Sequence, residues 1–164
     1  MDKILLIALS LICATSARAS AFQLTSPAFK QNDIIPVKFT CQGEDINPEL
    51  NISGIPEKTV SLALIVDDPD APMGTWVHWV VYDIMPTTIQ IAENTIPGTQ
   101  GYNDFKKVNY GGPCPPSGTH RYFFKLYALD TILKLSEGAT KAQVEEAMKE
   151  HIIAQTELMG LYKK

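Results

Sequence analysis

Residues 109–122 read N-Y-G-G-P-C-P-P-S-G-T-H-R-Y and lead directly into an apolar segment, residues 123–129. Gly111 and Gly112 permit positive φ or a close approach of the backbone to a ligand, while the three prolines fix φ and remove N–H donors. The stretch therefore predicts a stiff loop that ends in His-Arg-Tyr at the start of a strand. Such a loop can hold an imidazole and a phenol in place, as a preformed binding site requires.

A second proline-rich segment, D-D-P-D-A-P at 67–72, precedes the strand-like run W-V-H-W-V-V at 76–81. A residue before proline is driven out of the α region, so the chain around Asp68 should be extended. Extended chain alternates sides, which places Asp68 and Asp70 on one face and Asp67 on the other. We expect the 109–122 loop and this segment to form two walls of a small anion pocket. The side chains expected around that pocket are Asp68, Asp70, His78, His120 and Tyr122.

Each of these side chains also has an ordinary structural explanation. A histidine in the middle of a strand is often a core residue, and aspartates beside prolines often form turns. Strand alternation predicts that His78 lies on the face opposite Trp79. The residues expected to share its face are Trp76, Val80 and Tyr82.

The remaining pattern indicates a mainly β protein with one domain. The chain has 164 residues, of which 45% are hydrophobic and 20% charged, as in a globular domain with its own core. Thr140 and Gln143 form a capping box that predicts a helix over residues 141–151. The two long connections between strands are of a length that usually carries function. β-branched and aromatic runs predict strands at 34–40, 61–66, 76–84, 121–129 and 153–161, with Tyr162, Lys163 and Lys164 as an exposed tail.

The N-terminus has the pattern of a secretory leader. Lys3 precedes an apolar run over residues 4–14, and Ala17-Arg18-Ala19 is a cleavage signal before Ser20. The run is shorter than the roughly 20 residues of a membrane-spanning helix, so no transmembrane segment is expected. We therefore predict residues 1–19 as a signal peptide, an exported periplasmic or secreted protein, and one domain over 20–164. The alternative is a buried N-terminal helix or strand.

Charge and cysteine content narrow the classes of partner. The formal net charge of −4 argues against nucleic acid and against nonspecific attraction to an anionic membrane. In an oxidising compartment Cys41 and Cys114 would form an even pair. A disulfide and two free thiols both remain open, because sequence does not give the separation of the Cα atoms.

Several motifs together resemble one family. They are F-T-C-Q-G-E-D-I-N-P-E-L at 39–50, D-P-D-A-P at 68–72, V-H-W-V-V at 77–81, G-G-P-C-P-P followed by H-R-Y within 111–122, F-K-L-Y-A-L-D at 124–130, and T-E-L-M-G at 156–160. In this order they resemble the phosphatidylethanolamine-binding protein family, in its bacterial Raf-kinase-inhibitor-like branch, over nearly the whole chain after the leader. The resemblance implies an antiparallel β-sandwich with long loops and a helix near the C-terminus.

The resemblance also implies a cavity for phosphate, a phospholipid head group or a phosphorylated side chain. The matching positions are Asp68, Asp70, His78, Gly112, His120 and Tyr122. An oxyanion there would be held by imidazole N–H groups, the Tyr122 hydroxyl, and backbone N–H groups of Gly112 and Cys114. The carboxylates would accept the second imidazole N–H and would also suit an amino head group. The segment between Pro116 and His120, residues 117–119, is shorter than the corresponding segment of animal members. The chain also lacks an evident counterpart of their C-terminal helix, which covers the pocket, so ligand selectivity stays open.

The sequence thus predicts a non-catalytic binding protein, without cofactor or metal, whose oligomeric state is open and includes a dimer. The predicted leader separates the chain from cytosolic kinases, so kinase inhibition is not carried over as an activity, although a protein partner is not excluded. One alternative is inhibition of a secreted protease or another partner through surface loops, of which residues 85–118 are the longest. A less favoured alternative is a metal-dependent hydrolase that uses two histidines and two aspartates, but no short ligand spacing or separate nucleophile supports it.

Overall fold

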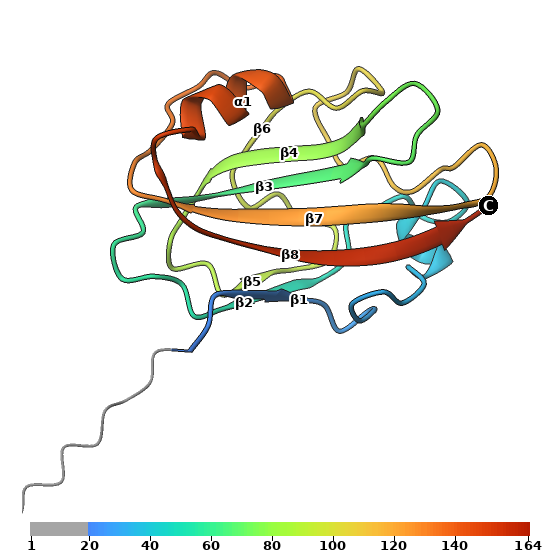
Figure 1. Ribbon diagram of the computed structural model, residues 1–164, viewed down its shortest axis with the longest axis horizontal. Helices are drawn as coiled ribbons and strands as arrows, with labels where there is room; N and C mark the ends of the chain where they lie inside the picture. Colours follow the sequence, from blue (N-terminus) through green and yellow to red (C-terminus); the bar gives the residue numbers. More distant parts are fainter. Residues whose placement is uncertain (1–19) are drawn as a thin grey trace, which may run out of the picture.

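The computed structural model describes residues 20–164 and arranges them in three layers (Figure 1). A large antiparallel sheet lies in the middle, with a small antiparallel sheet on one face and the helix α1, Lys141–Met148, on the other. The small sheet has the order β1-β2-β5, with β1 Gln23–Thr25, β2 Leu50–Ser53 and β5 Gln90–Ile91. The large sheet has the order β6-β4-β3-β7-β8, with β3 Ser61–Asp68, β4 Trp76–Ile84, β6 Thr99–Gln100, β7 Thr119–Leu129 and β8 Ile152–Lys163.

The apolar patterns of the strands explain this layering. Every residue of β3 is buried, because this central strand is covered on both faces. In β7 buried residues alternate with more exposed ones along most of the strand, as a strand covered mainly on one face requires. Its buried apolar residues that face the small sheet are Tyr122, Phe124, Leu126 and Ala128, and His120 and Leu129 are buried as well.

Two hydrophobic clusters hold the layers together. The larger cluster lies between the sheets and includes Leu50, Trp79 and Phe124. The smaller cluster lies between the large sheet and α1, which contributes Val144 and Met148. Thr140 and Gln143 form both hydrogen bonds of the predicted capping box. The mainly β fold with antiparallel sheets and a helix near the C-terminus is therefore confirmed.

Some local predictions were wrong. Residues 34–40 do not form a strand, because Pro36 begins a short 3₁₀ helix, Val37–Phe39, and only Ile34 makes an isolated bridge to β8. The helix ends at Met148, three residues before the predicted end. Tyr162 is not part of an exposed tail, since β8 continues to Lys163 and the Tyr162 side chain is buried.

The predicted leader, residues 1–19, lies outside the described residues. Among the helices of residues 20–164, none has the length and apolar character needed to cross a bilayer.

Candidate functional site

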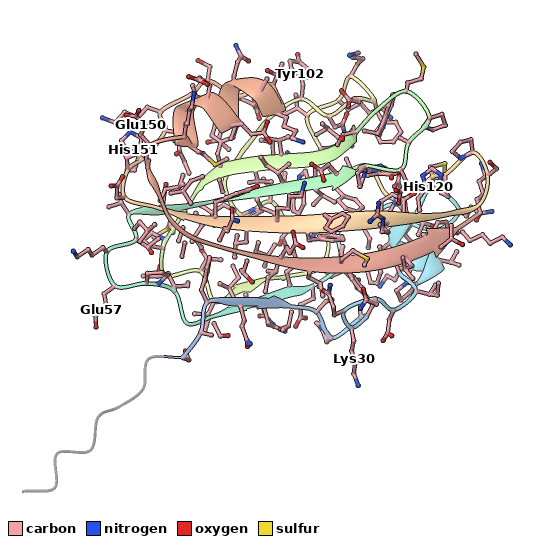
Figure 2. The ribbon with its side chains drawn as sticks, in the orientation of Figure 1. Lys30, Glu57, Tyr102, His120, Glu150 and His151 are labelled. Atoms are coloured by element: carbon pink, nitrogen blue, oxygen red, sulfur yellow. A yellow bond between two sulfur atoms is a disulfide. The ribbon has the colours of Figure 1, made fainter. Side chains whose placement is uncertain are left out.

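A cavity of about 330 Å³ opens at the end of the large sheet, between the end of β3 and the start of β4. Figure 2 shows His120 at this end of the sandwich. The 109–118 loop closes one side of the cavity and the turn after β3 closes another. The polar lining comes from Asp68 and His78, and the rest from Ala71, Pro72, Met73, Trp76, Phe105, Cys114, Pro115 and Pro116.

Asp68 and His120 form a buried pair that joins two neighbouring strands. His120 Nδ1 donates to Asp68 Oδ2 at 2.7 Å, and the two residues are 7% and 3% exposed. Asp68 Oδ1 accepts the backbone N–H of Asp70 at 2.8 Å. Because a carboxylate oxygen is the acceptor, Nδ1 of His120 carries a proton and the ring orientation is fixed. This is the arrangement expected for a carboxylate that accepts an imidazole N–H.

His78 is held differently, by a backbone carbonyl. Its Nδ1 donates to the Gly111 carbonyl oxygen at 2.7 Å, which leaves Nε2 as the ring nitrogen available to a ligand. The ring makes edge contacts with Tyr122 and Phe105, with centroids 5.2 Å and 5.4 Å away. Burial lowers the pKa of His78, while the bond to Gly111 opposes that shift. The expectation that a carboxylate would accept one N–H of each imidazole was therefore wrong for His78, although it holds for His120.

A β-bulge in β4 determines the direction in which the His78 side chain points. Val66 pairs with Trp79 and Asp67 with Val77, so His78 has no partner of its own in the ladder. Such an extra residue interrupts the alternation of side chains along a strand.

For this reason the predicted face of His78 was wrong with respect to Trp79, Val80 and Tyr82, whereas Trp76 does line the same cavity as His78. The His78 ring packs against Tyr122, which belongs to the same cluster as Trp79. Val77 instead belongs to the cluster beneath α1, with Val80 and Tyr82. The bulge therefore turns the imidazole toward the cavity end of the inter-sheet core.

Tyr122 contributes a buried polar group without a partner. Its side chain is fully buried, and its hydroxyl lies near Asp68 and the Cys114 backbone without a hydrogen bond of normal geometry to any described residue. Burial, together with the nearby negative charge of Asp68, raises the pKa of Tyr122, so the phenol stays protonated at neutral pH. A buried polar group left unpaired costs roughly 1–3 kcal/mol. Tyr122 does not itself line the cavity, but its ring lies against His78, which does.

Gly112 has a structural role that the sequence did not indicate. Its N–H donates to Asp45 Oδ1 at 2.6 Å, so it is not free to bind an anion as predicted. A Cβ atom at this position would lie 2.4 Å from the carbonyl oxygen of Phe39. Glycine is thus required because the loop packs directly on another backbone segment, and no positive φ is involved.

Cys114 lines the cavity and is bonded to Cys41. The S–S distance is 2.10 Å and the Cα atoms are 5.5 Å apart. The Cys41 N–H also donates to the Pro113 carbonyl at 3.2 Å, and the Tyr110 hydroxyl donates to the Phe39 carbonyl at 2.9 Å. The 3₁₀ segment and the site loop are therefore cross-linked covalently and by hydrogen bonds.

Asp70 does not line the cavity. Its carboxylate accepts from Arg121 Nε and Nη2 at 2.9 Å and 2.7 Å, and from the Arg121 backbone N–H at 3.0 Å. The guanidinium lowers the pKa of Asp70 to about 2. Asp70 thus ties the turn after β3 to β7 and positions Asp68. Sequence reasoning missed Arg121 in this role, although its place in the H-R-Y motif was a usable signal.

Asp67 faces away from the cavity, as alternation predicted. It is fully buried, and Lys125 Nζ and Lys141 Nζ approach its carboxylate at 2.8 Å and 2.6 Å. Two lysines from β7 and α1 therefore enclose one carboxylate of β3. This cluster anchors the helix to the sheet on the face opposite the site.

The apolar wall of the cavity was the other feature that sequence reasoning missed. Trp76 and Phe105 pack edge to face with centroids 5.5 Å apart, and Met73 is almost fully exposed at the tip of the turn. Phe105 lies in a loop without periodicity, so nothing in the sequence indicated its position. The wall suits the apolar part of a ligand that extends beyond a polar group.

The geometry does not gather the four residues of the hydrolase alternative. Asp68 binds His120, Asp70 binds Arg121, and His78 binds a carbonyl. Within residues 20–164, no group of three or more His, Cys, Asp or Glu side chains is placed to hold a metal ion.

Comparisons with known proteins agree with the fold and with the motifs at the site. A family profile described as phosphatidylethanolamine-binding protein matches residues 25–163. A UPF0098 protein of Methanothermobacter thermautotrophicus is 49% identical over 148 residues, which cover 86% of this chain and 98% of that protein.

Two solved structures are similar over 88% of this chain. One is a homologue of phosphatidylethanolamine-binding protein from Chlamydia trachomatis, with a TM-score of 0.85, 48% identity and 98% of its own chain covered. The other is Escherichia coli YbcL, described as a member of the mammalian family, with a TM-score of 0.82, 32% identity and 99% covered. The chain belongs to the phosphatidylethanolamine-binding protein family.

Proposed function

We propose that the cavity beside His78 binds a small ligand through a phosphoryl group and that the protein holds this ligand without transforming it. The observation that carries the proposal is the Tyr122 hydroxyl, which is buried and without a partner in the described chain. A protein retains such a group at a cost unless a ligand or water satisfies it. The hydroxyl lies behind the cavity lining, and its ring contacts His78, which lines the cavity, so we place the phosphoryl group beside His78 at the point nearest Tyr122.

The surrounding groups suit a phospholipid head group or a similar phosphorylated compound. Tyr122 offers a hydroxyl donor and His78 offers Nε2, while Asp68 is an acceptor that suits an ammonium group. A cavity of about 330 Å³ accommodates a head group, and the apolar wall accommodates what is attached to it. Arg121 and His120 hold the two aspartates of the segment in place before any ligand arrives.

The same geometry supports binding without catalysis. The cavity lining contains no serine, threonine or free cysteine among the described residues, because Cys114 is in a disulfide. The carboxylate of Asp68 is already engaged by His120 and by a backbone N–H. A nucleophile with an adjacent base, as covalent catalysis requires, is therefore missing from the lining.

A pair of tyrosine variants tests the binding proposal. Tyr122→Phe removes the unpartnered hydroxyl, so it should weaken binding of phosphoethanolamine by about 10- to 150-fold, the value of a hydrogen bond to a charged group. Because no hydrogen bond is lost within the protein, its stability should be unchanged or slightly higher. Isothermal titration calorimetry measures the first effect and thermal unfolding the second.

Tyr110→Phe is the matched control. Its hydroxyl donates to the Phe39 carbonyl, so its removal should lower stability by about 1 kcal/mol and leave binding nearly unchanged. Ethanolamine without phosphate should bind far more weakly than phosphoethanolamine. The proposal is wrong if neither inorganic phosphate nor phosphoethanolamine binds at millimolar concentration, or if Tyr122→Phe binds as well as the natural chain.

We propose further that the protein is exported, as a member of the bacterial Raf-kinase-inhibitor-like branch. The leader pattern over residues 1–19 supports this, and so does the disulfide, since such bonds persist in oxidising compartments. Fractionation followed by N-terminal sequencing should find the protein outside the cytoplasm with Ser20 as its first residue. Full-length protein in the cytoplasm would contradict this localisation.

A further inference from the structure

The cavity is unusual for an anion site because it contains no fixed positive charge. Among the described residues that line it, none is a lysine or an arginine, and one is the carboxylate of Asp68. Arg121 is engaged by Asp70, and Lys164 contacts the Cys114 sulfur at 4.0 Å without lining the cavity. A phosphate dianion placed here would meet a carboxylate in a partly buried site, which is costly unless its charge is reduced.

The tautomer of His78 adds to this difficulty. The Gly111 carbonyl can only accept a hydrogen bond, so Nδ1 must carry the proton and Nε2 of a neutral ring is a lone-pair acceptor. A fully ionised phosphate oxygen cannot form a hydrogen bond with that lone pair. A proton must therefore stand between Nε2 and the phosphate oxygen.

The groups around His78 favour its neutral form in the free protein. The ring is 3% exposed, and burial lowers the pKa of His78. The titratable groups near it are Asp68 at the end of β3, Tyr122 on β7, His120 behind Asp68, and Asp104, which binds the N–H of the residue before His78. Asp67 acts on it through its charge from the opposite face of the sheet. The negative charges oppose the effect of burial without cancelling it.

We infer that phosphate binding at this site is coupled to the uptake of one proton, and that His78 is the residue that imposes this coupling. The inference rests on the proposed function. The proton bridges His78 Nε2 and a phosphate oxygen, as P–OH donating to a neutral ring or as imidazolium donating to P–O⁻. A phosphate diester has no second titrating oxygen, so for a diester the proton must be on His78.

The consequence is a specific dependence on pH. A phosphate monoester has a second pKa near 6, so above neutral pH the free ligand is a dianion and His78 is neutral. Each bound ligand then takes up about one proton, and its affinity falls about tenfold per pH unit. Near pH 5 the free ligand already carries that proton, so the uptake on binding falls toward zero.

Calorimetry in buffers of different ionisation enthalpy counts these protons. Phosphoethanolamine is titrated into the full chain at about pH 8 and again at about pH 5, and the slope of the observed heat against buffer enthalpy gives the number taken up. We expect about one proton at the higher pH and close to none at the lower. Glycerophosphoethanolamine, a diester, should also take up about one at the higher pH.

Two histidine variants assign the proton. His78→Gln places an amide N–H where Nε2 was, so it should still bind phosphoethanolamine but take up close to no protons, with an affinity that no longer changes tenfold per pH unit. His151→Gln is the control, because His151 pairs with Asp130 at the opposite end of the sandwich (Figure 2). Its proton uptake should equal that of the natural chain.

Clear binding with no proton uptake at pH 8 overturns this inference and leaves the proposed function intact. Undiminished uptake in His78→Gln means that another group, such as the phosphate itself or the His120–Asp68 pair, holds the proton without His78, which overturns the assignment to His78. If His78→Gln does not fold, the proton number of the natural chain still decides whether the coupling exists. No heat with either phosphate compound at either pH overturns the proposed function and this inference with it.

Discussion

Removal of the Cys41–Cys114 disulfide should lower the stability of the fold without abolishing it. The perturbation is the double variant Cys41→Ser/Cys114→Ser, which also avoids a reductant. The bond joins residues 73 positions apart, so it closes a long loop in the unfolded chain. The chain-entropy relation for a loop of that length gives a loss of about 4 kcal/mol in the free energy of unfolding.

Non-covalent contacts should keep the site loop in place in the variant. The Cys41 N–H bond to Pro113, the Gly112 N–H bond to Asp45 and the Tyr110 hydroxyl bond to Phe39 do not depend on the sulfurs. We therefore expect a cooperative transition at a lower urea concentration, with a slope at least as steep as that of the natural chain because its unfolded state is less compact. Phosphate affinity should fall by less than the stability does, because Cys114 is only one part of the cavity lining.

Urea and thermal unfolding, followed by circular dichroism, measure the loss. For a domain of this size about 4 kcal/mol corresponds to a decrease in Tm of roughly 8–16 °C. The oxidised natural chain is the reference, and the same chain with dithiothreitol should reproduce the double variant. A double variant within about 1 kcal/mol of the natural chain would refute the reasoning, because it would mean that the bond does not restrict the unfolded chain as the loop-closure relation requires.

Three further perturbations follow from the same geometry. Asp67→Ala removes the carboxylate that two partly buried lysines enclose, so urea unfolding should show a free energy of unfolding lower by about 3 kcal/mol. The control Asp130→Ala breaks an exposed pair and should lower it by less than about 1 kcal/mol. Equal losses in the two variants would contradict this prediction. The pKa of Asp70 is about 2 in the folded protein against an ordinary 3.8, so protons favour the unfolded chain. The stability that Arg121 adds through Asp70 should therefore be complete above about pH 4 and disappear toward pH 2. It should amount to less than about 1 kcal/mol, because the pair is partly exposed. Unfolding curves of Asp70→Asn should lack this acid dependence. Gly112→Ala would place its Cβ 2.4 Å from a backbone oxygen, so we expect the free energy of unfolding to fall by about 1–3 kcal/mol and phosphate binding to weaken. An unchanged Tm would contradict this, because it would show that the loop shifts to accommodate the methyl group.

Sequence reasoning worked where a local pattern and the packing required the same structure. The apolar segment that becomes β3 and the alternating segment that becomes β7 were identified because burial on two faces or one leaves a direct trace in residue type. The capping box at Thr140 identified the start of α1 because its two hydrogen bonds are local.

It failed where a neighbour distant in the sequence decided the outcome. The bulge at His78 arises in the pairing of β4 with β3, and no single strand records its partner's register. Residues 34–40 have the composition of a strand, yet Pro36 and the docking of this segment on the site loop produce a 3₁₀ turn. Phe105 reaches the cavity from a loop that has no pattern of its own.

The sequence by itself determined the class of the fold, the motifs that identify the family, and most of the polar residues gathered at one end of the large sheet, because periodicity, capping and proline-stiffened turns are local properties. Only the tertiary structure decided which groups are free to meet a ligand. It engages the Gly112 N–H with Asp45 and Asp70 with Arg121, and it leaves the Tyr122 hydroxyl unpartnered within the described chain. The physical reason is that the residues packed beside a hydrogen-bonding group decide whether that group has a partner, and those residues are usually distant in the sequence.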